Sequence, residues 1–360
     1  MPAIPTNPNL TRRPLPGLLV RLLTPILKPM LGTLQRRDNL APGWIPGWTV
    51  YASYMVGDFF MALPALKHLK KSAARDGLPL RVICRPDCAE FLAREGIEAI
   101  PFADAFRVRP GVGSFLRTAR AARMLRGRLD DTVLDLDADP RTAFWLKLAG
   151  ARTVSYRRSF NALFDETFPL PEPSIHQADR DMRVVEEWVK RVGSEEWGVK
   201  SELKASPTPP SLTTQHSPLI TSSAPWLISL WTRKAEKNWP LGHWEALLEG
   251  FVAEGIPFLI LTPPDAGAAF LKFQQRWAGR APFLRGSLTQ IADAVRTGAG
   301  VIATDNFLGH MAGYYGKPVL WINLCSPAEQ VEPRGPRTIA VTNPSVEEAR
   351  RAFVELNRGS

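Results

Sequence analysis

The sequence contains few cysteines and no long apolar run, and each absence excludes a class of protein. Its three cysteines, Cys84, Cys88 and Cys325, form no C-x-x-C pair and no set with nearby histidines, so we expect free core thiols in a reducing compartment. No apolar run reaches the roughly 20 residues that a transmembrane helix needs. The amino end lacks the charged-then-apolar order of a secretory signal. These absences predict a cytoplasmic protein.

The sequence also lacks well-known short motifs for nucleotide and zinc sites, namely G-x-x-x-x-G-K-[ST], G-x-G-x-x-G and H-E-x-x-H. Two overlapping D-x-D spacings do occur, in Asp135-Leu136-Asp137-Ala138-Asp139. In some sugar transferases this spacing holds a metal on a nucleotide sugar, and in an extended strand Asp135 and Asp137 share a face. With no third ligand evident, we favour solvated carboxylates at a strand end. No metal or other cofactor is expected.

Positive charge is in excess, at a formal net +10, which favours an anionic partner. Half of this excess lies in residues 1–50, which hold six basic side chains and one acid. Within residues 15–37, apolar residues recur at helical spacing among basic ones, although Pro25 and Pro29 interrupt any helix. We predict that this segment contacts an anionic membrane surface; a helix packed on the domain surface is the alternative. No nucleic-acid partner is expected, because neither interleaved aromatics nor a known motif accompanies the charge.

Apolar strand patterns alternate with helical ones along most of the chain, which predicts parallel sheets covered by helices on both faces. The expected strands are 49–54, 80–84, 132–136, 226–231, 258–261, 300–304 and 319–324. The expected helices are 62–74, 86–95, 114–128, 241–254, 264–278, 288–297, 307–315 and 345–357. Residues 201–225 are rich in Ser, Thr and Pro, which is typical of a linker. We predict an α/β fold of two doubly wound, Rossmann-like domains, 46–200 and 226–360, facing a cleft, after a basic extension over 1–45.

A carboxylate follows the first expected strand, and ligands of doubly wound sheets bind at the carboxyl ends of strands. Asp58 follows this strand through Gly57, which permits a tight turn. Pro64 suits the first turn of the next helix. Asp58 is therefore well placed to accept a proton from a bound hydroxyl. The alternative is an aspartate that caps its own helix.

Three cations, Arg233, Lys234 and Lys237, lie on the loop after the expected strand 226–231, just before a helix that Pro240 opens. Such groups at a strand end suit a pyrophosphate. We predict that Thr232, Arg233 and Lys237 contact this anion. A solvated basic loop is the alternative.

A second acidic turn follows the expected strand 300–304. Asp305 and Asn306 lie in the turn, and His310 lies on the helix that begins there. A helix start attracts anions through its unpaired N–H groups and its dipole. We expect Asp305, with Asn306 beside it, either to cap the helix or to hydrogen-bond a sugar. His310 is either a buried structural histidine or an anion contact.

Arginines recur every three residues at Arg117, Arg120, Arg123 and Arg126, which gives one basic stripe on a helix. We name Arg117 and Arg120 as candidate contacts for an acidic acceptor or a lipid head group. A solvated helix face is the alternative.

Three motifs in order resemble the ADP-heptose:lipopolysaccharide heptosyltransferases, glycosyltransferase family nine, over residues 48–342. They are G-D-x-x-x-x-x-P-A-L at Gly57, Asp58, Pro64, Ala65 and Leu66; K-x-W-P with a later tryptophan at Lys237, Trp239, Pro240 and Trp244; and D-T-G-x-x-H-x-A with G-K-P at Asp305, His310, Ala312, Gly316, Lys317 and Pro318. Residues 151–193, with His176, are similar to the family's domain-closing segment. The resemblance implies the two-domain GT-B fold.

The resemblance also implies a role for each part. By this resemblance, residues 46–200 form the domain on the acceptor side, and residues 226–360 form the domain that binds the nucleotide sugar. Asp58 is similar to the base that deprotonates the acceptor, Lys237 to the lysine on the donor phosphate, and Asp305 to the acid on the donor sugar. The implied reaction is inverting, metal-independent transfer of a sugar such as heptose from an ADP-heptose-like donor to a lipopolysaccharide-type glycolipid or saccharide. The implied location is the cytoplasmic face of the inner membrane.

Two departures from the family pattern favour a different function. The family's Thr-Gly after the aspartate is Asn306-Phe307 here, and a phenylalanine hinders the approach of phosphate to backbone N–H groups. Residues 1–45 also precede the first domain, whereas the family starts almost directly with the first strand. The alternative is a non-catalytic GT-B-like binding or assembly protein in cell-envelope polysaccharide synthesis.

Overall fold

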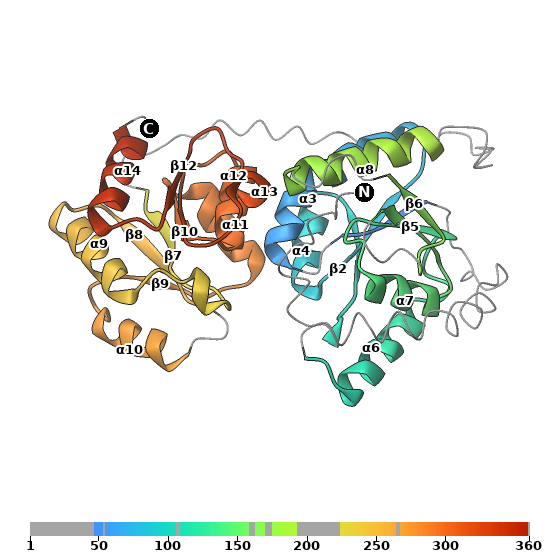
Figure 1. The fold of residues 1–360 in the computed structure, drawn as a ribbon, viewed down its shortest axis with the longest axis horizontal. Coiled ribbons are helices and arrows are strands. Elements are labelled where there is room, and N and C mark those ends of the chain that lie inside the picture. The colour runs from blue at the N-terminus through green and yellow to red at the C-terminus, as the bar shows by residue number, and fades with distance from the viewer. Residues whose placement is uncertain are drawn as a thin grey trace, which may run out of the picture. The chain divides into compact units, whose positions relative to one another are not determined.

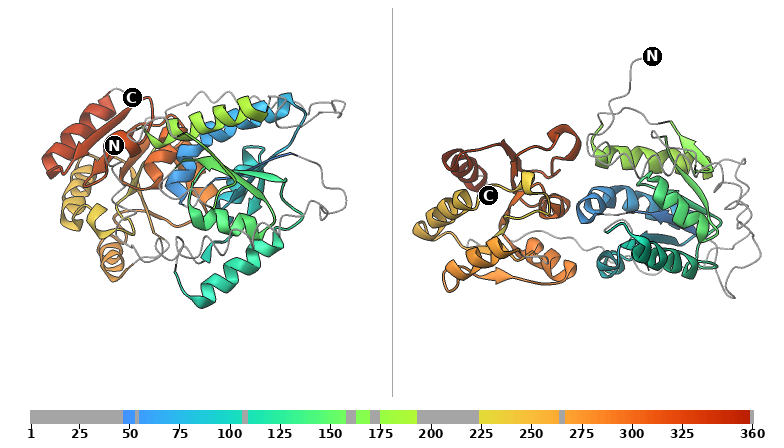
Figure 2. Two further views of the ribbon diagram at one scale, coloured as in Figure 1. Left: turned by 45° about the vertical axis from the view of Figure 1, so that its right-hand side comes forward. Right: turned by 60° about the horizontal axis from the view of Figure 1, so that its bottom comes forward.

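The computed structural model describes residues 47–52, 55–105, 109–157, 163–169, 175–192, 224–263 and 267–358. The chain divides into two compact units. The first unit holds Met1–Met55 and Ala62–Pro207, and the second holds Val56–Met61 and Thr208–Ser360. In each unit a twisted sheet lies between helices (Figures 1 and 2).

The first unit contains a six-stranded parallel sheet in the order β3-β2-β1-β4-β5-β6. Its strands are β1 (Trp48–Tyr51), β2 (Leu80–Cys84), β3 (Glu98–Pro101), β4 (Thr132–Asp135), β5 (Arg152–Tyr156) and β6 (Glu166–Phe168). Its described helices are α3 (Val56–Arg75), whose first six residues are grouped with the second unit, α4 (Pro86–Arg94), α6 (Val112–Met124), α7 (Pro140–Leu148) and α8 (Gln177–Val192). The central strand β1 is buried at every residue, as expected for a parallel sheet covered on both faces.

The second unit contains another six-stranded parallel sheet, in the order β12-β11-β10-β7-β8-β9. Its strands are β7 (Trp226–Ser229), β8 (Phe258–Leu261), β9 (Phe283–Leu284), β10 (Gly300–Thr304), β11 (Val319–Asn323) and β12 (Thr338–Thr342). Its described helices are η3 (Ala235–Lys237), α9 (Leu241–Ala253), α10 (Ala268–Arg276), α11 (Leu288–Thr297), α12 (Phe307–Tyr314), α13 (Ala328–Val331) and α14 (Val346–Arg358). Figure 1 shows α9 and α14 on one side of this sheet and α11 and α12 on the other.

The two sheets share one topology. In each sheet the first strand along the chain pairs with the second and the fourth, so the order reverses between β1 and β4 and between β7 and β10. Ligands of such sheets bind at the carboxyl ends of the strands beside this reversal. The two parallel sheets with interleaved helices confirm the predicted doubly wound α/β fold class.

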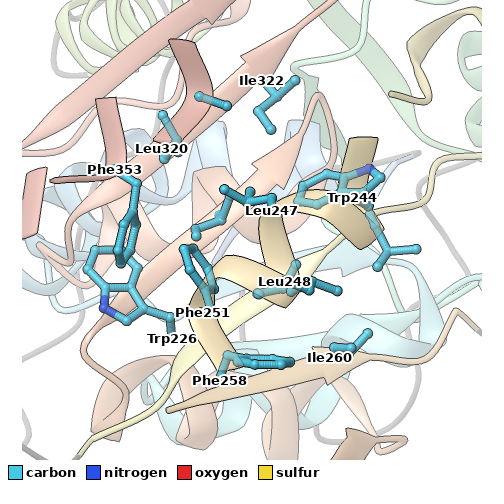
Figure 3. Packing of buried hydrophobic residues seen from close by; sticks show 14 of the residues in the cluster. Trp226, Trp244, Leu247, Leu248, Phe251, Phe258, Ile260, Leu320, Ile322 and Phe353 are labelled. Carbon is cyan, nitrogen blue, oxygen red and sulfur yellow. The ribbon is translucent and has the colours of Figure 1, made fainter. Parts of the chain in front are cut away.

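The core of the second unit fills the space between its sheet and the helices α9, α10 and α14 (Figure 3). Phe251 of α9 lies against Phe353 of α14, with ring centroids 4.5 Å apart. Phe353 in turn meets Trp226 of β7 edge to face at 5.0 Å. All three rings are buried to 2% exposure or less. Aromatic side chains bury a large apolar area, so this cluster contributes strongly to the stability of the unit.

Most expected elements are confirmed to within a few residues, but the start of α3 is not. This helix begins at Val56, six residues before the expected start, so Pro64 lies inside it and not in its first turn. The neighbours of this proline are apolar and buried, which shows that packing outweighs the loss of one helical hydrogen bond. The strands β3, β5, β6, β9 and β12 were not expected. Of these, β6 and β9 have only three and two residues, too few for a distinct alternating pattern.

Several predictions fall on residues outside the described ranges. These are the extension 1–45 with its membrane segment 15–37, most of the linker 201–225, and part of the segment 151–193. The domain boundaries at these places therefore remain predictions. Among the helices that the structure does describe, none is long and apolar enough to cross a bilayer. Cys84 and Cys88 are buried as expected, whereas Cys325 is exposed, so the expectation of a core thiol is wrong there.

We predict that Phe251→Ala lowers the free energy of unfolding of the second unit by about 3–5 kcal/mol, because it leaves a cavity among aromatic rings. The neighbouring side chain of Val252 is 43% exposed, so Val252→Ala serves as the control and should change this value by less than about 0.5 kcal/mol. Urea titration followed by tryptophan fluorescence measures both. Equal effects of the two substitutions would contradict the packing.

Candidate functional site

Asp305 connects three strand ends of the second unit. It follows β10, and its Oδ2 accepts hydrogen bonds from Lys237 Nζ, in the loop after β7, and from Ser326 Oγ, in the loop after β11. The side chains of Lys237 and Asp305 are only 20% and 9% exposed, so their ion pair is well shielded from solvent. The strands β7, β10 and β11 are neighbours in the sheet. Two of the predicted donor-binding residues, far apart in the sequence, therefore lie together at the reversal of strand order.

Asn306 caps the helix α12 and also bridges the reversal. Its Oδ1 accepts the backbone N–H of Leu308 at 3.0 Å. Its Nδ2 donates to the Oγ of Ser229, the last residue of β7, at 3.0 Å. Of the two roles expected for Asp305, helix capping therefore belongs to Asn306. Asparagine is at least as good an N-cap as the threonine of the family motif.

Two hydrogen bonds between Thr232 and Asn238 close the loop after β7. The backbone N–H of Thr232 donates to Asn238 Oδ1 at 2.6 Å, and Asn238 Nδ2 donates to the carbonyl oxygen of Thr232 at 3.1 Å. Thr232 Oγ1 also donates to the carbonyl oxygen of Lys234 at 2.8 Å. The hydrogen bonds of Thr232 thus stay within the loop, whereas the side chain of Arg233 is exposed to solvent. The contact fixes η3, which carries Lys237.

Ser326 was not identified from the sequence. Its backbone N–H donates to Asn323 Oδ1 at 2.9 Å, and Asn323 Nδ2 donates to its carbonyl oxygen at 2.9 Å. This pair holds the turn after β11 so that the Ser326 hydroxyl reaches Asp305. The only sequence signal was an asparagine that ends a buried strand and precedes a short polar turn. Ser229 was missed because its partner Asn306 is distant in sequence, whereas Asn238 acts within its own loop through Thr232.

His310 and Lys317, both in the third motif, are buried in the second unit at 7% exposure each. Lys317 Nζ donates to the carbonyl oxygen of Gly298, at the carboxyl end of α11, at 2.9 Å. Burial lowers the pKa of this lysine. Lys317 therefore supports the α11–β10 connection, while His310 lies on α12, four residues after its N-cap.

Asp58 lies in the first turn of α3, the helix that follows β1. The N-cap position belongs to Met55, so the alternative that Asp58 caps the helix is wrong. A carboxylate in a first helical turn is stabilised by the helix dipole. Its side chain is partly exposed, which allows a ligand to reach it.

The acidic run after β4 is buried, so the interpretation as solvated carboxylates is wrong. Asp135 is fully buried, and its Oδ1 accepts the backbone N–H groups of Asp137 at 2.8 Å and Ala138 at 3.2 Å. Asp139 caps α7 and forms an ion pair with Arg141 at 2.6 Å. These carboxylates build the turn at the reversal of the first sheet. No group of three or more candidate metal ligands occurs within the described ranges.

Arg117 and Arg120 are exposed on α6 in the first unit. Neither forms an ion pair with any residue in the part of the chain that the structure describes. Both side chains are therefore accessible to the predicted acidic acceptor.

The arrangement in the second unit suits an anion that carries a polar group. Lys237 offers an ammonium group beside the positive end of α12, and Arg233 lies exposed on the same loop. Asp305 supplies a carboxylate that accepts hydrogen bonds next to this positive region. A phosphate joined to a hydroxyl-bearing group satisfies both.

We predict that Asn306→Ala lowers the unfolding free energy of the second unit by about 1–2 kcal/mol, because it removes the N-cap of α12 and the bridge to β7. Asn306→Thr restores the side-chain cap and should recover a large part of this loss. Thermal unfolding measures both. A threonine variant as unstable as the alanine variant would show that capping is not the stabilising contact.

Comparisons with known proteins bear on the family and the fold of the chain. The family model described as glycosyltransferase family 9 (heptosyltransferase) matches residues 118–357, a range that begins after Asp58. Escherichia coli heptosyltransferase WaaC with ADP is 17% identical, with a TM-score of 0.64 over 86% of this chain and 99% of that chain. The ADP-heptose lipopolysaccharide heptosyltransferase II of the same organism is 16% identical, with a TM-score of 0.64 over 87% and 99%.

A family 9 glycosyltransferase of Veillonella parvula is 16% identical, with a TM-score of 0.63 over 88% of this chain and 99% of that chain. A comparison with curated proteins gave no match. The low identities show a shared fold, whereas the family match covers 240 of the 360 residues. The predicted resemblance is thereby confirmed: the chain is an enzyme that belongs to glycosyltransferase family 9, the heptosyltransferase family.

Proposed function

We propose that the enzyme transfers a sugar, with inversion and without a metal, from a nucleotide-diphosphate donor of the ADP-heptose class to a glycolipid of the lipopolysaccharide type. The main support is the contact of Lys237 and Ser326 with Asp305 at the reversal of the second sheet. The structural neighbours include WaaC with ADP and WaaC with ADP-2-deoxy-2-fluoro heptose. Their names favour an adenine nucleotide as the leaving group here.

In the proposed donor complex, the diphosphate lies against Lys237, Arg233 and the start of α12. The ammonium group of Lys237 has three N–H donors, so its contact with Asp305 uses one and leaves two for phosphate oxygens. Asp305 accepts a hydrogen bond from a hydroxyl of the sugar. His310 lies further along α12 and supports the phosphate side. The positive groups stabilise the charge that develops on the leaving diphosphate, a task that a metal performs in other transferases.

Asp58 is the proposed base on the acceptor. It takes the proton of the acceptor hydroxyl while the hydroxyl oxygen bonds to the anomeric carbon and the bond from that carbon to the phosphate oxygen breaks. The nucleoside diphosphate leaves with the bonding electrons, and attack from the opposite face inverts the anomeric configuration. Arg117 and Arg120 are the proposed contacts for acidic groups of the acceptor. The enzyme would act at the cytoplasmic face of the inner membrane, with residues 15–37 on the anionic lipid.

The second candidate function is a binding or assembly protein that does not catalyse transfer. Phe307 in place of the family's glycine is the observation that favours it. The cap formed by Asn306 supports catalysis instead, because it holds the start of α12 beside the contact of Lys237 with Asp305. The two functions differ in donor binding: a protein that retains no nucleotide sugar in calorimetry or mass spectrometry is not a transferase.

We predict that Asp58→Asn lowers kcat by about 10²- to 10⁴-fold and leaves donor affinity unchanged, because the amide cannot accept the proton. Asp76→Asn at the opposite end of α3 is the matched control and should leave kcat unchanged. Release of the nucleoside diphosphate in the presence of acceptor measures the rate. Wild-type activity of the Asp58 variant would remove this residue from the role of base.

We predict that Lys237→Met weakens binding of the nucleotide-diphosphate donor by about 10- to 100-fold, because it removes charge-assisted hydrogen bonds to phosphate. Lys272→Met, on the exposed side of α10, is the control and should bind the donor normally. Isothermal titration calorimetry with ADP-heptose measures the dissociation constants. Unchanged affinity of the Lys237 variant would place the donor elsewhere.

A further inference from the structure

The helix α6 presents its large apolar side chains to solvent. Seven large apolar side chains are exposed in the described part of the chain, and four lie on this helix: Val112 at 79%, Phe115 at 37%, Leu116 at 61% and Met124 at 66%. Its buried positions hold small residues instead, namely Ser114, Thr118, Ala119 and Ala122. A helix on the surface of a globular domain normally shows the reverse pattern.

The exposed apolar residues share one face of α6. Val112, Leu116 and Met124 fall in a single row at spacings of four and eight, and Arg120 completes that row. Phe115 lies at its inner edge, with its ring centroid 5.2 Å from that of Trp145 in α7. Figure 1 shows α6 at the periphery of its unit, beside α7. The row is therefore an outward apolar surface and not an extension of the core.

The charge around this row has one sign. Residues 109–128 contain six arginines and no aspartate, glutamate or lysine. Arg117, Arg120 and Arg123 are all exposed, and within the described ranges none of them has an ion-pair partner. Other exposed arginines of the chain do have partners, such as Arg280 with Glu249 at 2.6 Å. The unneutralised charge on α6 calls for an anionic partner.

We propose that the outward face of α6, formed by Val112, Leu116, Arg120 and Met124 with Arg117 and Arg123 beside it, docks on an anionic phospholipid bilayer. Apolar side chains enter the boundary between head groups and acyl chains, while arginines extend to the phosphates. A second copy of the chain fits poorly, because it would bring arginines against arginines. The surface lies outside residues 15–37 and does not depend on the proposed reaction.

Docking through α6 would also place the acceptor side of the enzyme toward the lipid. In a parallel sheet, the helix that follows a strand begins at the carboxyl edge of that sheet. The chain enters α6 after β3 and α3 after β1, so both helices begin at that edge. Asp58 lies in the first turn of α3. The start of α6 and the proposed base thus lie at the same edge of the first sheet.

Flotation of the full chain with vesicles tests the affinity. We expect binding to phosphatidylglycerol vesicles that weakens with added salt, and little binding to phosphatidylcholine vesicles. Val112→Ser/Leu116→Ser/Met124→Ser should weaken binding by at least about tenfold, and Arg120→Gln/Arg123→Gln by about fivefold for each arginine. The matched controls, Val252→Ser/Leu271→Ser and Lys272→Gln/Arg285→Gln, change exposed residues of the second unit and should bind normally.

A local probe separates α6 from any other lipid-binding segment, including residues 15–37. An environment-sensitive fluorophore is attached to Leu116→Cys or, as the control, to Leu271→Cys, each in a chain with Cys325→Ser, because Cys84 and Cys88 are buried. Phosphatidylglycerol vesicles should shift the emission at position 116 to shorter wavelength and leave position 271 unchanged. A chain that floats without this shift, or that does not bind these vesicles at all, overturns the proposal. Neither readout uses transferase activity.

Discussion

The contact between the carboxylate of Asp305 and the side chains of Lys237 and Ser326 is the interaction on which the proposed donor site is built. It joins the loops after three neighbouring strands, β7, β10 and β11, which meet only because the sheet is parallel. A buried carboxylate needs hydrogen-bond donors, and this one receives them from both sides. The same contact places an ammonium group beside a helix start. The atoms that hold this turn together are thus also those of the proposed anion site.

The repeated topology explains why the polar residues gather at the reversals of the two sheets. At the second reversal, Asn306 joins the ends of β7 and β10; at the first, Asp135 and Asp139 build the turn between β4 and α7. The two turns differ in what they leave for a ligand. The first turn holds three aspartates, of which Asp139 is paired with Arg141, whereas the second pairs its one aspartate, Asp305, with Lys237. This difference supports placing the anionic donor on the second sheet.

The sequence predicted the fold class and seven of the twelve described strands, because buried strands leave local patterns. It also singled out Lys237 and Asp305, whose side chains the structure brings into contact. It failed where a contact links distant residues. The start of α3 was misplaced because Pro64 and Gly57 suggested a boundary that packing overrides. The prediction of solvated carboxylates after β4 is wrong because burial is not a local property of the sequence. Ser326 could not be identified, since its partner lies on another strand.

Hydrogen exchange of the full chain with and without ADP tests the donor site on Asp305, because it locates the bound nucleotide without an acceptor. We expect ADP to slow exchange over residues 232–238 and 305–308, and over residues 323–326, in which Ser326 contacts Asp305. Protection should persist with ADP-heptose. Saturating ADP that leaves these segments unprotected, or that protects only the first unit, would contradict a donor site built on Asp305.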